Sequence, residues 1–463
     1  MKRALLLALL PLLAGACGRA PPTAPHIVLV VCDALRADHL DLHGYGRETA
    51  PRLAAWAQGA LVFEQASAPS NWTRPSIHAL FTGRHPAPDR VLAADEPLPA
   101  DEAVLPDLLR RAGYETAAVT ANPFISRTYG ADRGFREFVD LGWRGEEATG
   151  PWKEPLASAA VLDRVEYLLA SRARGAPLFL YVHLMDTHEP YDPPAELRED
   201  VDPAYAGPVD GSREGYALLR DGDAVLPADA RQVVALYDGE VRRLDEGLAR
   251  LRALVARHLG DRRVVTVVTA DHGESLGEEG LWRHGHGLHR GLLNVPLIVD
   301  GAGAATRVGQ RVGLVDLGPT LLRLAGAEAP GDIDGRDLLA ERDEAGVPRL
   351  PAGRDLIAYR ALPDRPTTIR GHGVAALGEL AVLRDGWRAE RRADGWRLFE
   401  EATGRDRSAE QAVLLEELVE GARAWEQRGR ARLAAAGDAA PAGAMDLSPD
   451  ERALLEQLGY TGR

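Results

Sequence analysis

The sequence predicts an α/β fold, with a largely parallel central sheet covered by helices on both faces and a smaller antiparallel-sheet-and-helix subdomain after it. Two observations predict it. Through the first two thirds of the chain, short apolar runs rich in β-branched residues alternate with longer helical patterns, as in a parallel sheet buried on both faces. After about Arg342 this alternation stops, and short runs separated by hairpin turn residues follow. We therefore expect a large domain over residues 26–342 and a subdomain over 355–434.

The large domain contains five apolar runs that predict strands and four helical patterns between them. The strands are expected at 27–31, 116–120, 178–184, 264–269 and 295–299, and the helices at 51–58, 103–112, 157–173 and 229–258. In a sheet of this kind, ligands bind beyond the carboxyl ends of the strands. The residues that follow each strand are therefore the first candidates for a functional site.

The subdomain follows a stretch rich in Pro and Gly at 345–354. Two turn dipeptides, Asp385-Gly386 and Asp394-Gly395, separate three short strands and predict hairpins. The strands are expected at 380–384, 387–391 and 396–400, and a helix at 409–434. Residues 435–463 are expected to be a linker and a closing helix, because a capping box with a proline at the first helical position stands near their end.

The N-terminus has the pattern of an export signal. Two basic residues precede an apolar run from Ala4 to Leu13, which is too short to cross a bilayer, and small residues lead to Cys17. Residues 1–17 are expected to be a lipoprotein-type signal peptide with Cys17 as the lipidated residue, and residues 18–25 a stiff tether. This interpretation predicts an exported bacterial lipoprotein held in the periplasm or at the outer membrane by its lipid. An ordinary signal peptide with a chance cysteine is the alternative.

The net charge of the chain bears on its binding partners, and its cysteine content bears on how the fold is stabilised. The net charge of -14 argues against nucleic acid as a partner. Cys32 is the only other cysteine, so no intramolecular disulfide is expected if Cys17 is lipidated. An exported chain without a disulfide depends on its core, and 463 residues with 45% hydrophobic content are enough for a large one.

Three of the predicted strands end in an aspartate. Asp33 follows the first strand, Asp271 and His272 follow the fourth, and Asp186 and His188 follow the third. A helix-capping Asp explains any one of them alone, but three at one sheet edge are better explained by metal binding. Adjacent carboxylate and imidazole ligands suit a divalent transition metal such as Zn or Mn. We expect one or two divalent ions (Ca, Zn or Mn) at this edge.

Thr73 is the candidate nucleophile. It precedes Arg74 and Pro75 and an apolar helical run that ends at Gly83. The N-terminus of a helix favours an anion, and a hydroxyl that a metal coordinates there loses its proton more easily and can attack phosphorus or sulfur. A threonine that only caps the helix is the alternative.

A glycine-rich loop, WRHGHGLH, carries three histidines before the last strand of the large domain. Histidines beside a metal site can act as ligands or contact the oxygens of a substrate. We expect His284 to act in catalysis and His286 to contact substrate, and His289 is a third candidate. A solvated loop is the alternative.

In their order along the chain, these segments resemble the motifs of the sulfatase family, within the alkaline-phosphatase superfamily. The resemblance covers nearly the whole mature chain and implies an alkaline-phosphatase-like three-layer sandwich. It also implies metal ligation, a nucleophile and ester-oxygen contacts at positions that match the family's motifs. The matching segments are 33–40, 73–83, 183–191, 271–274, 284–285 and 295–298. The implied metal ligands are Asp33, Asp271 and His272, with Asp186 for a second ion; Thr73 takes the position of the nucleophile, and His188 and His284 contact ester oxygens or assist the leaving group.

The chain departs from the arylsulfatases of that family at several positions. Ala34 stands where they carry a second Asp, Asn122 where they carry a Lys, and Ile77 where their motif has an Arg. We expect Asn122 and Arg74 to bind substrate and Arg36 to take part in catalysis, because Arg74 or Arg36 could supply the missing charge.

The most important departure is Thr73 itself, because arylsulfatases convert Cys or Ser at this position into formylglycine and threonine cannot be converted. A formylglycine hydrate releases sulfate through its second hydroxyl; Thr73 has one, so water must attack the phosphorus or sulfur of the intermediate. The sequence therefore predicts a metal-dependent hydrolase of a small-molecule, glycan or lipid ester, with phosphate favoured over sulfate. The alternatives are a sulfatase that uses Thr73 directly, a phosphoethanolamine- or phosphoglycerol-type transferase, and a lipoprotein that binds an anionic glycan or headgroup without turnover.

Overall fold

A computed structural model of the chain describes residues 23–86, 98, 102–142, 157–216, 219, 225–360, 378–392 and 394–436. The expected signal peptide and closing helix lie outside these residues.

The large domain is built on a mostly parallel sheet that has nine strands within the described residues. Their order is β10-β2-β9-β6-β1-β5-β3-β4, with β11 also paired to β2. Only β9 runs antiparallel to its neighbours, β6 and β2, and the other pairings in this sheet are parallel. The strands are β1 (His26–Cys32), β2 (Leu61–Ser67), β3 (Glu115–Thr120), β4 (Glu137–Asp140), β5 (Leu178–Leu184), β6 (Val264–Thr269), β9 (Asn294–Asp300), β10 (Thr306–Val308) and β11 (Val312–Gly313).

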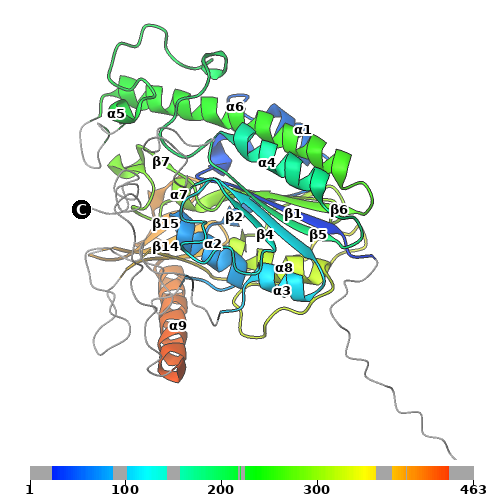
Figure 1. Cartoon of the computed structure of the whole chain (residues 1–463). Helices are drawn as coiled ribbons and strands as arrows, with labels where there is room; N and C mark the ends of the chain where they lie inside the picture. Colours follow the sequence, from blue (N-terminus) through cyan, green and yellow to red (C-terminus); the bar gives the residue numbers. More distant parts are fainter. Residues whose placement is uncertain are drawn as a thin grey trace, which may run out of the picture.

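Helices cover both faces of this sheet (Figure 1). One layer consists of α1 (Pro51–Ala57), α4 (Ser158–Ser171) and α6 (Pro227–His258), which pack on one another. The other consists of α2 (Thr73–Thr82), α3 (Leu105–Arg111) and α8 (Leu317–Leu324). The predicted α/β sandwich of three layers is therefore confirmed.

Shorter elements lie near the carboxyl ends of β1, β5 and β6, on the side of the molecule where Figure 1 shows α7 and β7. They are α5 (Arg213–Tyr216), β7 (Ser275–Leu276), β8 (Trp282–Arg283) and α7 (Arg290–Leu293). Single turns of 3-10 helix occur at Ala37–His39, Asp41–His43, Ala195–Leu197, Glu278–Gly280 and Leu314–Asp316.

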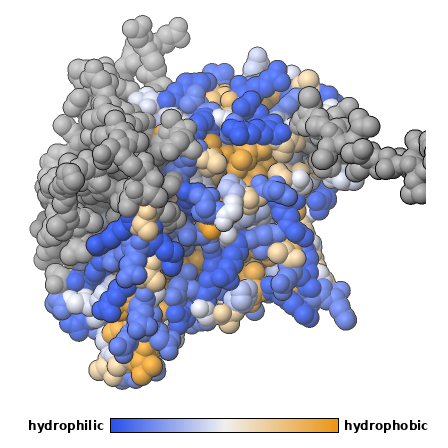
Figure 2. Space-filling model, turned by 90° about the horizontal axis from the view of Figure 1, so that it is seen from below, coloured by the Kyte–Doolittle hydropathy of each residue, from blue (hydrophilic) through white to orange (hydrophobic). Residues whose placement is uncertain are grey.

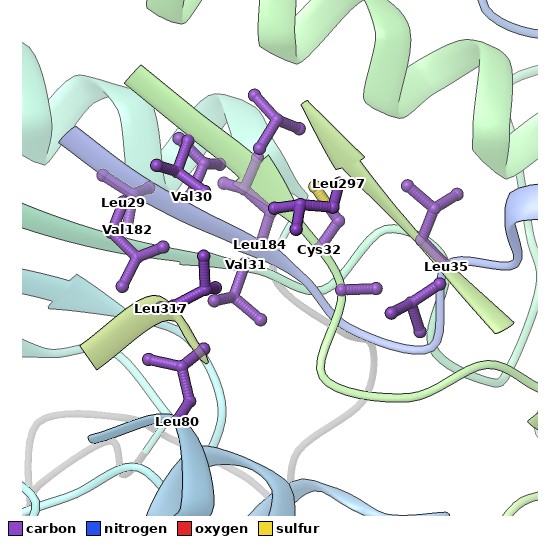
Figure 3. Packing of buried hydrophobic residues seen from close by; sticks show 14 of the residues in the cluster. Leu29, Val30, Val31, Cys32, Leu35, Leu80, Val182, Leu184, Leu297 and Leu317 are labelled. Atoms are coloured by element: carbon purple, nitrogen blue, oxygen red, sulfur yellow. The ribbon is translucent and has the colours of Figure 1, made fainter. Parts of the chain in front are cut away.

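The core lies between the sheet and its two helical layers. All seven residues of β1 and of β5 are buried, which explains why these strands are continuous apolar runs rather than alternating ones. Figure 3 shows the side chains of β1 and β5 together with Leu80 of α2 and Leu317 of α8. A rigid, buried β1 fixes the position of whatever follows its last residue.

The C-terminal subdomain is an antiparallel sheet with one helix against it, as predicted. Its strands pair in chain order: β12 (Leu356–Arg360), β13 (Glu379–Arg384), β14 (Trp387–Arg392), β15 (Gly395–Glu400) and β16 (Arg405–Asp406). The helix α9 (Ala412–Ala436) covers β13 to β15, and Trp425 packs on Tyr359 in a separate small core. Asp385 and Gly386 both have positive φ, as a two-residue hairpin turn requires.

The sequence patterns did not predict β2, β4, β10, β11 or α8. β2 contains Glu64 and Gln65 in the middle of its apolar run, where the strand has an irregular register and these two side chains reach the surface. β4, β10 and β11 are edge strands of two to four residues, too short for a periodic pattern to be visible.

The visible surface in Figure 2 is mainly hydrophilic, with hydrophobic areas between hydrophilic ones. Within the described residues, the exposed large apolar side chains are Tyr167, Leu226 and Val413. No helix in the described part of the chain is both long enough and apolar enough to cross a membrane.

Candidate active site

The register of the sheet brings four polar side chains to one face at its carboxyl edge. Val31 of β1 pairs with His183 of β5 and with Thr269 of β6, and Thr120 of β3 also pairs with His183. Side chains alternate between the faces of a sheet, so residues two positions further along lie on the same face. Asp33, Asp271 and Asn122 follow Val31, Thr269 and Thr120 by two residues. All three therefore lie on the face that His183 shares.

The hydroxyl of Thr73 joins this group from the first residue of α2. α2 begins at Thr73, with Trp72 as its N-cap, so the capping alternative does not describe this threonine. Its Oγ1 lies 3.3 Å from Nε2 of His272 and 3.3 Å from Nδ2 of Asn122, and its side chain is fully buried. The positive end of the α2 dipole lies at this residue and favours an anion at Thr73.

Asp33 is held by one of its two carboxylate oxygens. Oδ2 accepts hydrogen bonds from Nδ2 of Asn122 at 2.5 Å and from Nε2 of His183 at 2.9 Å. Oδ1 has no hydrogen-bond partner among the described residues, although it is buried. Burial alone would raise the pKa of Asp33, but the hydrogen bond from His183 and the nearby His188 and His272 outweigh it and lower the pKa. Asp33 is therefore ionised and offers one free buried oxygen.

Asp271 offers a second free oxygen. Its Oδ1 accepts from the backbone N–H groups of Ala34 and His272 at 3.3 and 3.0 Å, while Oδ2 has no partner in the described part of the chain. Burial and the charge of Asp33 raise the pKa of Asp271. Two buried carboxylates that raise each other's energy in this way are stabilised by a cation between them.

His272 directs the lone pair of its Nε2 toward the free oxygens of Asp33 and Asp271. Its Nδ1 donates to the carbonyl of Gly273 at 2.7 Å, so in the neutral ring Nε2 carries no proton. Nε2 lies 3.5 Å from Oδ1 of Asp33 and 3.4 Å from Oδ2 of Asp271. Nε2 of His272, the free carboxylate oxygens of Asp33 and Asp271 and the Thr73 hydroxyl together form a set of ligand atoms that fits a divalent cation. The ligand-capable atoms of Asp33, His183 and Asp271 also lie within 4.8 Å of one another.

Two more histidines line the site beside this group. The ring of His284 lies 4.5 Å from that of His272 and 4.8 Å from that of His188, measured between centroids. Nδ1 of His188 donates to the carbonyl of Glu189 at 2.8 Å. Burial would lower the pKa of His188, but the charge of Asp33 and of nearby glutamates raises it, whereas burial and the two neighbouring imidazoles lower the pKa of His284. His188 is therefore the better proton donor of the two.

Glu274 orients His284. Its carboxylate lies 3.1 Å from Nδ1 of His284 and accepts a hydrogen bond of 2.7 Å from the hydroxyl of Tyr191. Burial raises the pKa of Glu274 to about 7 despite the charge of His188 and the bond from Tyr191. The arrangement directs Nε2 of His284 away from Glu274.

The structure places two other sequence-predicted residues, Asp186 and Arg36, in different surroundings. The Asp186 carboxylate accepts from the backbone N–H of Ser158 at 3.0 Å and so caps α4. Arg36 forms ion pairs with Asp38 and Glu278, so its charge is paired with carboxylates of the surrounding loops.

Arg74 is buried with its guanidinium 4.4 Å from the ring centroid of Tyr129. His286 is half-buried two residues after His284, and His289 caps α7 by accepting from the N–H of Gly291.

Sequence reasoning missed His183 and Glu274 as members of this site. Both lie in motifs that were matched, but neither ends a strand. The signal for His183 is its place inside an otherwise apolar, fully buried strand, where a polar side chain needs a polar partner.

Comparison with known proteins gives a family match and several relatives. A family model described as Sulfatase matches residues 25–327. The chain is similar to phosphatidylethanolamine transferase Mcr-2 of Escherichia coli, with 24% identity over 266 residues, which are 56% of this chain and 45% of the relative. The chain therefore spans less than half the length of that relative. It is also similar to PehA of Trinickia caryophylli, a multifunctional alkaline phosphatase superfamily protein, with 24% identity over 396 residues, covering 68% of this chain and 77% of PehA.

Among solved structures, the chain is similar to the phosphonate monoester hydrolase of Agrobacterium radiobacter. The TM-score is 0.68 at 19% sequence identity, and the match covers 88% of this chain and 96% of that one. A likeness at this identity shows a shared fold, and it confirms the alkaline-phosphatase-like architecture expected from the sequence.

Proposed function

Because the chain belongs to the sulfatase family, we propose that it is a metal-dependent hydrolase that cleaves a phosphate ester with Thr73 as its nucleophile. One observation carries this proposal. The Thr73 hydroxyl lies beside the free Nε2 of His272, at the point where two buried carboxylate oxygens have no partner among the described residues. The candidate nucleophile therefore lies next to the candidate cation site.

The residues that would hold the cation are Asp33, Asp271 and His272. Two carboxylates with an imidazole favour Zn or Mn, whereas a calcium site is typically all oxygen, with more ligands than these. A divalent cation bound there would lower the pKa of the Thr73 hydroxyl and take up negative charge from the ester oxygens. Ala34 supports this choice, because it leaves out the second aspartate that the arylsulfatases carry.

In the first step the Thr73 oxygen, having lost its proton to solvent, bonds to phosphorus. The bond from phosphorus to the leaving alcohol breaks, and His188 gives the alcohol oxygen a proton. In the second step water attacks the phosphorus, its proton passes to His188, and the Thr73 oxygen leaves and is reprotonated. The products are an alcohol and a phosphate group that has gained the oxygen of water.

The single hydroxyl of threonine favours phosphate over sulfate. Formylglycine can expel sulfate through its second hydroxyl, but a group bound to Thr73 can leave only by attack at its own central atom. Phosphorus accepts such in-line attack when cations and positioned donors neutralise its oxygens.

A transferase is the second candidate, because the chain matches a transferase over part of its length. In that case an alcohol replaces water in the second step. The catalytic groups would be the same, and only the acceptor would differ.

We further propose that the enzyme is exported and anchored by a lipid on Cys17, and that its substrate is a small-molecule, glycan or lipid ester. The N-terminal sequence pattern supports this placement. A Cys17→Ala variant is expected to move from the membrane fraction to the soluble fraction, and a variant that stays in the membrane fraction would contradict the anchor.

The test of the proposed activity uses the chain without its signal peptide, loaded with Zn or Mn. Aryl phosphate, aryl phosphodiester and aryl sulfate are assayed side by side, with Thr73→Ala as the variant. We expect turnover of a phosphate ester that Thr73→Ala loses. Turnover of aryl sulfate alone would favour a sulfatase, and tight metal binding without any turnover would favour a binding protein.

A further inference from the structure

We propose that Tyr181 and His183 form a hydrogen-bonded chain that positions Asp33, with His183 as a donor to the carboxylate and not as a ligand of the cation. The inference rests on the cation site proposed above. It assigns a role to two buried residues of β5 that are not among the proposed cation ligands.

The chain of contacts runs along β5 and ends on Asp33. The hydroxyl of Tyr181 lies 2.7 Å from Nδ1 of His183, and Nε2 of His183 lies 2.9 Å from Oδ2 of Asp33. Both side chains are fully buried. Tyr181 and His183 are two residues apart on a strand, so their side chains lie on the same face.

The direction of these hydrogen bonds follows from Tyr181. Burial raises the pKa of its phenol, so it keeps its proton. That buried O–H has His183 as its partner within the described residues, so it donates to Nδ1. The proton of the neutral imidazole is then on Nε2, where it is donated to Asp33.

A protonated Nε2 has no lone pair for a metal. His183 could otherwise be a ligand, because its ring nitrogen, Asp33 and Asp271 are close enough together to share an ion. The two roles exclude each other, since one nitrogen cannot both donate a proton to Asp33 and give its electron pair to a cation.

The contacts of Asp33 favour the donor role. Its Oδ2 already accepts from the amide nitrogen of Asn122 as well as from His183, whereas Oδ1 has no partner in the part of the chain described. With the hydroxyl of Thr73, which also donates to Oδ2 at 3.5 Å, these donors fix the rotation of the carboxylate and leave the other oxygen to face His272. Groups that hold a ligand in this way tune metal affinity without touching the metal.

The first test removes one hydroxyl from the chain. Tyr181→Phe is expected to weaken zinc binding about 10- to 100-fold, measured by competition with a chromophoric chelator. Tyr114→Phe is the matched control, because Tyr114 is also buried and donates one hydrogen bond of 2.9 Å, to Pro25 at the other end of β1. Both variants are expected to lower the melting temperature, but only Tyr181→Phe should change the zinc affinity.

The second test separates a donor from a ligand at His183. A glutamine can place an N–H near the position of Nε2 but is a poor zinc ligand, so His183→Gln should bind zinc within a few-fold of wild type while His183→Leu should bind it much more weakly. X-ray absorption of the protein with one zinc per chain should show one imidazole.

Two imidazoles in the wild type and one in His183→Leu, or equal loss of affinity in His183→Gln and His183→Leu, would overturn the donor role. Wild-type zinc affinity in both Tyr181→Phe and His183→Leu would overturn the chain of contacts while leaving the proposed function intact. A wild-type protein that binds no zinc or manganese would overturn both.

Discussion

Nε2 of His272 lies 3.3 Å from Oγ1 of Thr73. The imidazole and the hydroxyl come from a loop after β6 and from the first residue of α2, which are 199 positions apart in the chain. Nδ1 of His272 is committed to the carbonyl of Gly273, so the nitrogen that faces Thr73 is the one that can bind a cation.

Asp271→Asn should have opposite effects on the metal-free and metal-loaded protein. Burial and the charge of Asp33 raise the pKa of Asp271, so a neutral amide should stabilise the metal-free fold by removing an unfavourable buried charge. Wild type should gain about 2.7 kcal/mol at a zinc concentration 100 times its Kd, and the variant much less. Denaturant unfolding with and without zinc measures both effects.

The control for this prediction is Asp300→Asn, at the far end of the sheet, where the carboxylate accepts from Nε1 of Trp56. It should lower stability and leave the gain on zinc binding unchanged. An Asp271→Asn protein stabilised by zinc as strongly as wild type would show that Asp271 is not a ligand.

His188→Ala should reveal a general acid through the leaving group. The charge of Asp33 and of nearby glutamates raises the pKa of His188, which favours the protonated imidazole that can supply a proton to a leaving alkoxide. We expect kcat/KM to fall about 10²- to 10⁴-fold for an alkyl ester. A nitrophenyl ester should be affected far less, because nitrophenolate leaves without a proton. An equal fall for both esters would argue that His188 only binds the substrate.

Glu240 of α6 should make stability depend on pH. Burial raises its pKa from 4.5 to about 8, so between these values the unfolded chain has lost a proton that the folded protein keeps. The free energy of unfolding should therefore fall as the pH rises from about 5 to about 8, by up to ~1.4 kcal/mol per pH unit from this group.

Glu240→Gln should remove this fall, so its advantage over wild type should grow across the same pH range. Glu246→Gln, on the same helix with a half-exposed side chain, is the control and should show no such trend. A constant difference between wild type and Glu240→Gln at pH 5 and pH 8 would contradict the raised pKa.

Much of the site could be predicted because the rule that places it is simple. Carboxyl ends of parallel strands meet at one edge, so Asp33 and Asp271 could be brought together from their positions after two apolar runs. Thr73 was predicted to lie at the same site from the sequence motif around it. These predictions needed only the identity and order of the strands.

The rest depended on contacts that the sequence does not display. Arg36 was expected in catalysis, but it forms an ion pair with Glu278, which lies 242 positions away. Neither segment contains a sequence pattern that predicts this ion pair. Asp186 caps α4 through Ser158, which precedes it by 28 residues. The direction of β9 was also hidden, because an apolar run is the same whether the strand runs parallel or antiparallel.

The position of His183 at the site could not be predicted either, because it depends on the register of the strands. Its neighbours Val31 and Thr120 are known only once the strands are paired, and a slip of one residue would turn its side chain away from Asp33. The pairing of the strands therefore decided which residues met at the site.

The most direct test of Thr73 as the nucleophile is to trap the intermediate on its oxygen. The zinc- or manganese-loaded protein is mixed with an aryl phosphate ester that it turns over, quenched in acid within milliseconds, digested, and the peptides are weighed by mass spectrometry. We expect a phosphoryl adduct on Thr73, absent from Thr73→Ala, which should also lose turnover. Undiminished turnover by Thr73→Ala, or an adduct on a different residue, would contradict this role of Thr73.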